Sequence, residues 1–254
     1  MRHKINKCTK LLYLFIVLAF MYLPIVFLAI ASFDESKLGT GKGFTLKWYA
    51  ELFSRSDVMD ALWVTLSIAV FATAISTIVG TAAAIGFYGM KRRTSSAMTV
   101  INNFPMMNPD IVTGISLMLL FAFIGIRRGY VTLLLAHLVF CIPYVVLAVL
   151  PKLKTMNPHL YEAALDMGAT PSAALIKVVI PQIRPGIITG ALLAFTMSLD
   201  DFAVSFFTGG TYYIYSCVKT GIEPYLNALS VLMFLVILIL MIFINKRADL
   251  TELY

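Results

Sequence analysis

The sequence predicts an all-α integral membrane protein with six transmembrane helices. Of its 254 residues, 60% are hydrophobic and only 13% are charged, against about 25% charged in an ordinary soluble domain. Mean hydropathy is +0.88. The apolar residues are gathered in runs of the roughly 20 residues that a helix needs to cross a bilayer core about 30 Å thick. This pattern excludes a soluble enzyme, a disordered chain and a nucleic-acid-binding protein.

Six apolar runs define the expected spans within one domain, residues 1–254. The first run also has features of a signal peptide, namely a basic start and small residues at Ala29 and Ala31. It is longer than the usual apolar region of about 7–15 residues and is interrupted by Pro24, so we expect a retained helix. The expected spans are about 11–31, 62–90, 97–126, 129–150, 186–208 and 225–245.

The distribution of basic residues predicts the orientation. Most of the 20 Lys and Arg residues fall at the two ends and in the loops after the second and fourth spans, which should be cytoplasmic. The first external loop, 32–61, contains Phe44 to Tyr49, a stretch that suits an interfacial helix or a docking surface. The basic residues on the cytoplasmic side are Arg2, Lys4, Lys7, Lys10, Lys91, Arg92, Arg93, Lys152, Lys154, Lys177, Arg184, Lys246 and Arg247.

One acidic residue, Asp110, lies inside the third span. A charged side chain at the centre of a membrane helix costs about 2.5–3.5 kcal/mol on insertion scales, so it normally faces a bundle interior or a water-filled path. Pro105 and Pro109 predict a break in the helix before it, and Asn108 is expected to cap the helix where it restarts. Asp110 then either lines a pore or is a first-turn residue stabilised by the helix dipole.

Asp200 and Asp201 lie in the outer half of the fifth span. Adjacent helical residues point about 100° apart, so at most one of them should face the bundle axis. They form either a hydrogen-bonded structural pair or part of a path for a cation or protons, because no Lys or Arg partner occurs within the spans.

Two further groups of side chains have two interpretations each. His137 and Cys141 share a helix face and are either soft metal ligands or packing residues. Tyr212 and Tyr213, in the last external loop, either hold a cation over their rings or belong to the aromatic belt at the membrane interface. The three cysteines show no metal-binding spacing, so we expect no metal site and no cofactor in this chain.

Small residues recur every four positions in the second span, which predicts close packing of that helix against another. They are Ala72, Ser76, Gly80 and Ala84.

The cytoplasmic loop 151–185 is too short for a catalytic domain but too long for a turn. It predicts a helix from His159 to Met167, ended by Gly168, and a second helical piece that stops at Pro181. It holds no nucleophile–base pair and no phosphate-binding loop, so the chain has no ATPase site of its own. Two short helices on this face predict a docking element.

The same loop resembles the EAA loop of ABC importer permeases. The family pattern is EAA, three residues, Gly, nine residues, then Ile-x-Leu-Pro, and the spacing here matches in full. The residues at the positions of the pattern are Glu162, Ala163, Ala164, Gly168, Val178, Ile180 and Pro181. Val178 and Ile180 replace the Ile and Leu of the pattern conservatively.

Three other segments resemble the spermidine/putrescine permeases of the PotC type, namely Met107–Val112, His137–Tyr144 and Ser198–Phe202. The resemblance extends from about Leu11 to Asn245. It implies a type I importer permease with a MetI-like fold in a bacterial cell membrane, with both termini cytoplasmic. The implied partners are a second permease, two ATPase subunits that hold ATP and Mg²⁺, and an external polyamine-binding protein.

By this resemblance the chain is a permease subunit rather than an enzyme, and it couples to the ATPase through Glu162, Ala163, Ala164, Asp166 and Gly168. The polyamine path is expected to include Asp110, Asp200, Asp201, Tyr212 and Tyr213. The alternatives are an ABC permease for another solute, an ion-coupled secondary transporter and a channel.

Overall fold

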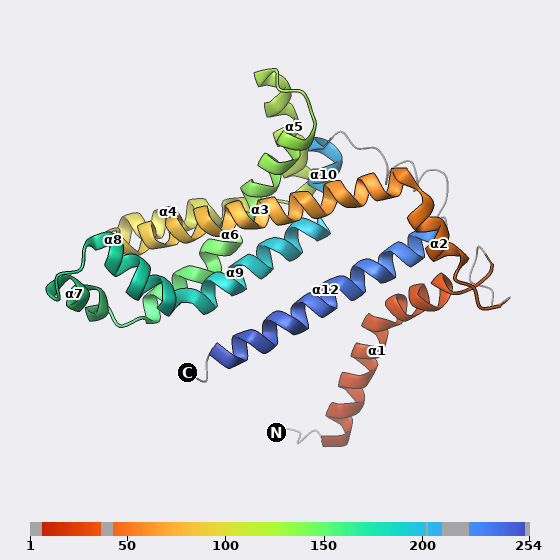
Figure 1. Cartoon of the computed structure of the whole chain (residues 1–254), viewed down its shortest axis with the longest axis horizontal. Helices are drawn as coiled ribbons and strands as arrows, with labels where there is room; N and C mark the ends of the chain where they lie inside the picture. The colour runs from red at the N-terminus through yellow and green to blue at the C-terminus, as the bar shows by residue number, and fades with distance from the viewer. Residues whose placement is uncertain (1–6, 37–42, 202, 210–223, 252–254) are drawn as a thin grey trace, which may run out of the picture. The chain divides into compact units, whose positions relative to one another are not determined.

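The computed structural model describes residues 7–36, 43–201, 203–209 and 224–251, and nearly all of these are helical (Figure 1). The elements in chain order are α1 (Lys7–Ser32), α2 (Lys47–Ser54), α3 (Ser56–Gly89), α4 (Arg92–Met107), α5 (Asp110–Ile124), α6 (Tyr130–Thr155), α7 (His159–Asp166), α8 (Pro171–Ala174), a π-helical turn (Leu175–Val179), α9 (Ile180–Asp200), α10 (Ala203–Thr208) and α12 (Pro224–Thr251).

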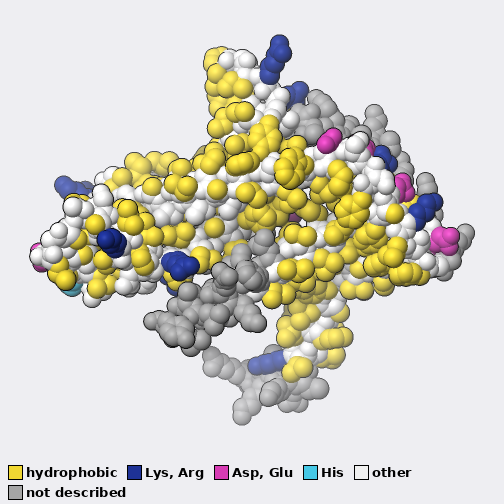
Figure 2. Space-filling model, in the orientation of Figure 1, with side chains coloured by type: hydrophobic (Ala, Val, Ile, Leu, Met, Phe, Trp, Pro, Cys, Tyr) yellow, Lys and Arg dark blue, Asp and Glu magenta, His cyan; other side chains and the backbone are white. Residues whose placement is uncertain are grey.

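The predicted apolar runs fall on these helices. Four helices, Lys10–Ser32, Ser56–Gly89, Tyr130–Thr155 and Pro171–Asp200, are long and apolar enough to cross a membrane. Helices α4 and α5 together would form a fifth span, bent by 100° at the break between them. Hydrophobic side chains such as Leu119 and Phe123 are exposed on α5. Figure 2 shows hydrophobic side chains spread over much of the visible surface of the molecule. A multi-pass membrane protein is thereby confirmed, whereas the count of six spans and the single domain stay predictions.

The chain divides into two compact units, residues 1–60 with 213–240 and residues 61–212 with 241–254. In the first unit only Lys47 to Tyr49 of the predicted interfacial stretch are helical, as the first turn of α2, and α2 is tied to the end of α1. The Trp48 indole N–H donates to the Asp34 carbonyl over 2.7 Å, and the hydroxyls of Ser32 and Tyr49 lie 2.9 Å apart.

The core of the second unit lies where α3 and α9 pack against α6. A Cβ atom on Gly80 would lie 2.7 Å from Cβ of Val145, and one on Gly190 would lie 3.1 Å from Cα of the same valine. The absence of side chains at these two glycines therefore lets three helices meet around Val145. The predicted ridge of small residues is buried, namely Ala72, Ser76, Gly80 and Ala84.

The predicted break before Asp110 is present, but the predicted cap is wrong. Asn108 is the last flanking residue of α4, and α5 starts from Pro109 without a side-chain cap. The Pro109 carbonyl accepts the N–H groups of Val112 and Thr113, at 3.0 and 3.1 Å. The fixed extended backbone of the second proline therefore starts the new helix, and the asparagine side chain is not needed.

The second helical piece of the loop does not stop at Pro181, contrary to the sequence expectation. Helix α8, the π-helical turn and α9 form one continuous helix from Pro171 to Asp200. In the π-helical turn each N–H bonds one residue further back, as Ile180 does to the Leu175 carbonyl. Because the hydrogen-bond pattern is already displaced in this turn, the helix continues through Pro181, which lies at the start of α9 and has no N–H to donate.

Candidate functional site

The EAA loop is built around the turn at Gly168, which ends α7. Gly168 has φ +87°, a left-handed conformation that favours glycine. Its N–H donates to the Leu165 carbonyl at 2.8 Å, and the Ala169 N–H donates to the Ala164 carbonyl at 3.0 Å. This pair of bonds is the Schellman motif, which satisfies the last carbonyls of a helix. The predicted turn is confirmed.

Helix α7 presents its polar side chains outward, and none of its residues is buried. The Glu162 side chain is 72% exposed, and its Oε2 lies 3.4 Å from Nδ1 of His159. Met167, just after the helix, is 89% exposed. A hollow of about 530 Å³ adjoins α7, with Glu162 and Tyr88 among its lining residues. An exposed carboxylate on this short helix and an exposed methionine just after it form a surface suited to a protein partner.

The second polar region is the break between α9 and α10. The expectation of one continuous fifth span is wrong, because α9 ends at Asp200 and Asp201 is extended. The Asp201 carboxylate accepts the N–H of Val204 at 3.2 Å on Oδ1 and the N–H of Ser205 at 3.0 Å on Oδ2. It also accepts the Ser205 hydroxyl at 3.4 Å. Asp201 therefore caps the first turn of α10, and this capping is what interrupts the span.

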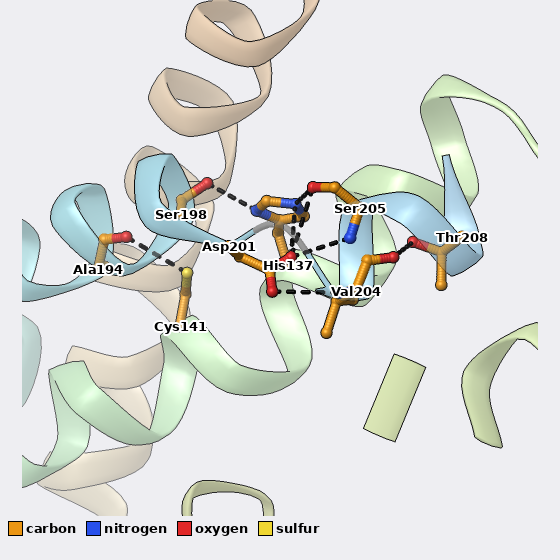
Figure 3. Close-up of polar contacts among 8 residues, drawn as sticks. All are labelled: His137, Cys141, Ala194, Ser198, Asp201, Val204, Ser205 and Thr208. Carbon is orange, nitrogen blue, oxygen red and sulfur yellow. Dashed lines mark hydrogen bonds and ion pairs between the residues drawn. The ribbon is translucent and has the colours of Figure 1, made fainter. Parts of the chain in front are cut away.

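His137 of α6 faces this break (Figure 3). Its Nδ1 lies 2.7 Å from the Ser198 hydroxyl, and its Nε2 lies 3.1 Å from the Ser205 hydroxyl and 3.7 Å from Oδ2 of Asp201. One turn later, the Cys141 thiol donates to the Ala194 carbonyl at 3.4 Å. Among the residues that the structure describes, no three groups are placed to hold a metal ion. The contact of Cys141 favours the packing interpretation for that residue, whereas His137 makes polar contacts on both sides of the break.

The other predicted acidic residues lie near the break or at a helix start. Asp110 is exposed in the first turn of α5, and Asp200 is exposed at the end of α9. Helix α10, whose first turn Asp201 caps, packs against α5, and Asp110 is the first residue of α5. Within the described part of the chain, no Lys or Arg forms an ion pair with these three carboxylates. Tyr212 and Tyr213 lie outside the described residues.

The sequence reasoning missed Ser198 and Ser205. Each is 61 or more positions from His137 along the chain, so no helical spacing relates them to it. A local signal does exist for the cap itself, because an Asp directly before a short apolar stretch is a typical start of a helix. That signal was hidden inside an apolar run that suggested a continuous span.

Comparison of the sequence with known proteins identifies the family of this chain. The family model described as the binding-protein-dependent transport system inner membrane component matches residues 76–250. The chain is 39% identical to the spermidine/putrescine transport system permease protein PotC of Haemophilus influenzae, over 91% of this chain and 92% of that protein. It is 36% identical to the Escherichia coli K12 protein of the same name, over 89% and 88% of the two chains. Against the putrescine transport system permease protein PotI of that strain, identity is 36%, over 88% and 84%.

Solved structures agree on the fold. A chain of the MetNI methionine ABC transporter, in an inward-facing conformation, superposes with a TM-score of 0.63 at 20% identity, covering 76% of this chain and 95% of that one. A chain of a bacterial ABC transporter that imports alginate gives a TM-score of 0.69 at 16% identity, covering 96% of both. The fold is that of type I ABC importer permeases, and the chain belongs to the family of binding-protein-dependent transport system inner membrane components.

Proposed function

We propose that this chain is a permease subunit of an ATP-dependent importer for polyamines such as spermidine and putrescine. One observation carries the proposal: proteins named as spermidine/putrescine permeases match it at 39% and 36% identity over nine tenths of its length. Similarity of this extent includes both polar regions described above, not the membrane helices alone.

The carboxylates around the α9–α10 break suit a substrate with several positive charges. Asp110 and Asp200 are exposed in this chain, and neither has a basic partner among the described residues. Asp201 adds a third negative charge, although its oxygens are engaged in capping. Spaced acidic groups can replace part of the hydration shell of a polyamine without trapping it at one site. Tyr212 and Tyr213 stay in the proposed path on the evidence of the sequence.

The proposed partners are a second permease, an ATPase dimer that holds ATP and Mg²⁺, and an external polyamine-binding protein. The exposed surface of α7, with Glu162 and Met167, would contact the ATPase from the cytoplasm. Ala163, Ala164 and Asp166 would belong to the same contact, and Gly168 would fix its turn. Closure of the ATPase dimer would then move this loop, and only contacts that differ between the two states can drive the change. In this proposal both termini are cytoplasmic.

Uptake of radiolabelled spermidine by the complete complex in lipid vesicles tests the proposal. We expect uptake to require both ATP inside the vesicle and the external binding protein, and to continue when an ionophore dissipates ion gradients. ATP-dependent uptake of a different solute alone would contradict the polyamine assignment. Uptake that collapses with the ionophore while ATP remains would indicate a secondary transporter, and flux without ATP would indicate a channel.

A further inference from the structure

A single buried imidazole bridges the two sides of the α9–α10 break. The side chain of His137 is only 2% exposed, and it contacts Ser198 in the last turn of α9 and Ser205 in the first turn of α10. Asp201, which lies between these serines in the chain, is 7% exposed. In Figure 3 the ring lies between the two serine hydroxyls, with the Asp201 carboxylate beside it.

The hydrogen bonds of this cluster have one consistent direction. A carboxylate only accepts, so the Ser205 hydroxyl donates its proton to Asp201. Ser205 must then accept from Nε2–H of His137, which leaves Nδ1 of the neutral ring to accept from the Ser198 hydroxyl. These proton positions are assigned by satisfying the network with Asp201 ionised. Every donor in the chain of bonds points toward the Asp201 carboxylate, and such bonds strengthen one another in a buried site.

We propose that His137 is a positioning residue for cation transport, acting through Asp201. It holds the last turn of α9 and the first turn of α10 at a fixed angle, and so it fixes the capped carboxylate in place. Helix α10 packs against α5, whose first residue is Asp110. The far end of α10 is also attached to α6, because the Thr132 hydroxyl donates to the Thr208 carbonyl at 2.9 Å. His137 therefore sets where the acidic groups lie relative to one another.

Neither alternative for His137 accounts for these contacts. Both ring nitrogens are occupied by serine hydroxyls, so no lone pair is left for a metal ion. Simple packing does not require two polar bonds across a helix break. Cys141 shows what packing alone looks like here, because it is fully buried on the same face of α6 and, within the described part of the chain, its thiol bonds to a carbonyl of α9 without crossing the break. Cys141 is therefore the matched control.

A double-mutant cycle on uptake by the complete complex tests the inference, which rests on the proposed function because its readout is polyamine uptake. His137→Ala should lower the maximal uptake rate about tenfold, the size expected for losing a bond that supports a charged group. Asp201→Asn should lower it comparably, and the variant with both changes should be no slower than Asp201→Asn alone. In the control cycle, the fold-reduction of the uptake rate in the Cys141→Ala, Asp201→Asn double variant should instead equal the product of the two single fold-reductions.

Multiplicative loss in the His137 cycle would overturn the inference. If His137→Ala prevents assembly of the complex, His137→Gln replaces it in the cycle, because the glutamine amide offers one donor and one acceptor. The His137→Gln variant should retain more uptake than His137→Asn, because an asparagine side chain is too short to reach both serines. Equal loss in the two variants would also overturn the inference. Absence of polyamine uptake by the wild-type complex would overturn the proposed function and this inference with it, whereas normal wild-type uptake with a multiplicative cycle overturns this inference alone.

Discussion

The EAA loop and the α9–α10 break both place carboxylates beside long apolar helices. The carboxylate of the loop is exposed, whereas the carboxylate of the break is buried and hydrogen-bonded. Glu162 is 72% exposed, and it contacts His159, whose side chain is 82% exposed. Asp201 is 7% exposed and accepts three hydrogen bonds from the next helix. The loop thus leaves its charge available to another protein, whereas the break satisfies its charge internally. The first arrangement suits a contact that forms and loosens, and the second suits a fixed local geometry.

This difference predicts where mutations act. Changes at the loop should separate ATP hydrolysis from transport and leave the chain folded. Changes at the break should alter transport and, when the cap is lost, stability as well.

The largest effect is expected for Glu162→Ala. Removing one partner of a charged contact at an interface typically costs about 2–5 kcal/mol, so uptake should fall about thirtyfold or more. Transport-linked ATP hydrolysis should fall with it, while the external protein still binds its polyamine. Asp60→Ala removes an exposed carboxylate outside the loop and is expected to retain coupled hydrolysis. Full coupling in Glu162→Ala would mean that the motif does not have its family role here.

Asp201→Asn should reduce uptake about tenfold without affecting assembly, because asparagine caps a helix about as well as aspartate but carries no charge. Asp201→Ala should lose the cap as well, at a further cost of about 1 kcal/mol in stability. Uptake kinetics and thermal unfolding of the purified complex measure the two effects separately. Unchanged uptake kinetics in Asp201→Asn would remove this residue from the path.

Gly168→Ala should impair coupling, because a residue with a Cβ atom is strained by about 1–2 kcal/mol in the left-handed conformation that Gly168 adopts. No atom lies within 4 Å of the added methyl group, so the backbone conformation is the cause of the effect. Gly168→Asn is the matched variant, since asparagine visits this conformation more readily. The ratio of polyamine imported to ATP hydrolysed should fall in the alanine variant and recover in the asparagine variant.

The smallest effect on transport is expected for Gly80→Ala, which changes the packing between helices. Its methyl group would lie 2.7 Å from Cβ of Val145, and relief of this clash should cost about 1–3 kcal/mol of stability. Gly86→Ala on the same helix meets nothing within 4 Å and should instead stabilise the helix by up to about 1 kcal/mol. Melting temperatures of the two complexes should therefore move in opposite directions, with the coupling ratio unchanged in both.

Local chemistry allowed much of the loop to be predicted from the sequence. Helix α7 begins at His159, directly after the pair Asn157-Pro158, and it ends at Gly168, which adopts the left-handed conformation. Both ends are determined by residues next to them in the sequence. The long apolar helices and the break before Asp110 follow from composition and from proline in the same way. These features depend on residues only a few positions apart.

The site at the break could not be predicted in full, because its contacts join distant parts of the chain. Helical spacing relates His137 to Cys141, yet the hydrogen-bond partners of His137 lie 61 and 68 positions away. The apolar run around Asp201 predicts a continuous helix, and this signal is stronger than the signal for a helix cap at Asp201. The helix continuing through Pro181 depends on a π-helical turn, which no simple periodicity reveals.

The bend between α4 and α5 has a consequence for the synthesis of the protein. Helix α4 has only 16 residues, starts with Arg92 and Arg93 and contains Asn102 and Asn103. It is therefore too short and too polar to pass from the translocon into the membrane by itself. It reaches the hydropathy of a span only together with α5, and it packs against α6. Insertion of α4 should therefore wait until α6 has been made, which makes biogenesis of this part of the permease cooperative rather than sequential.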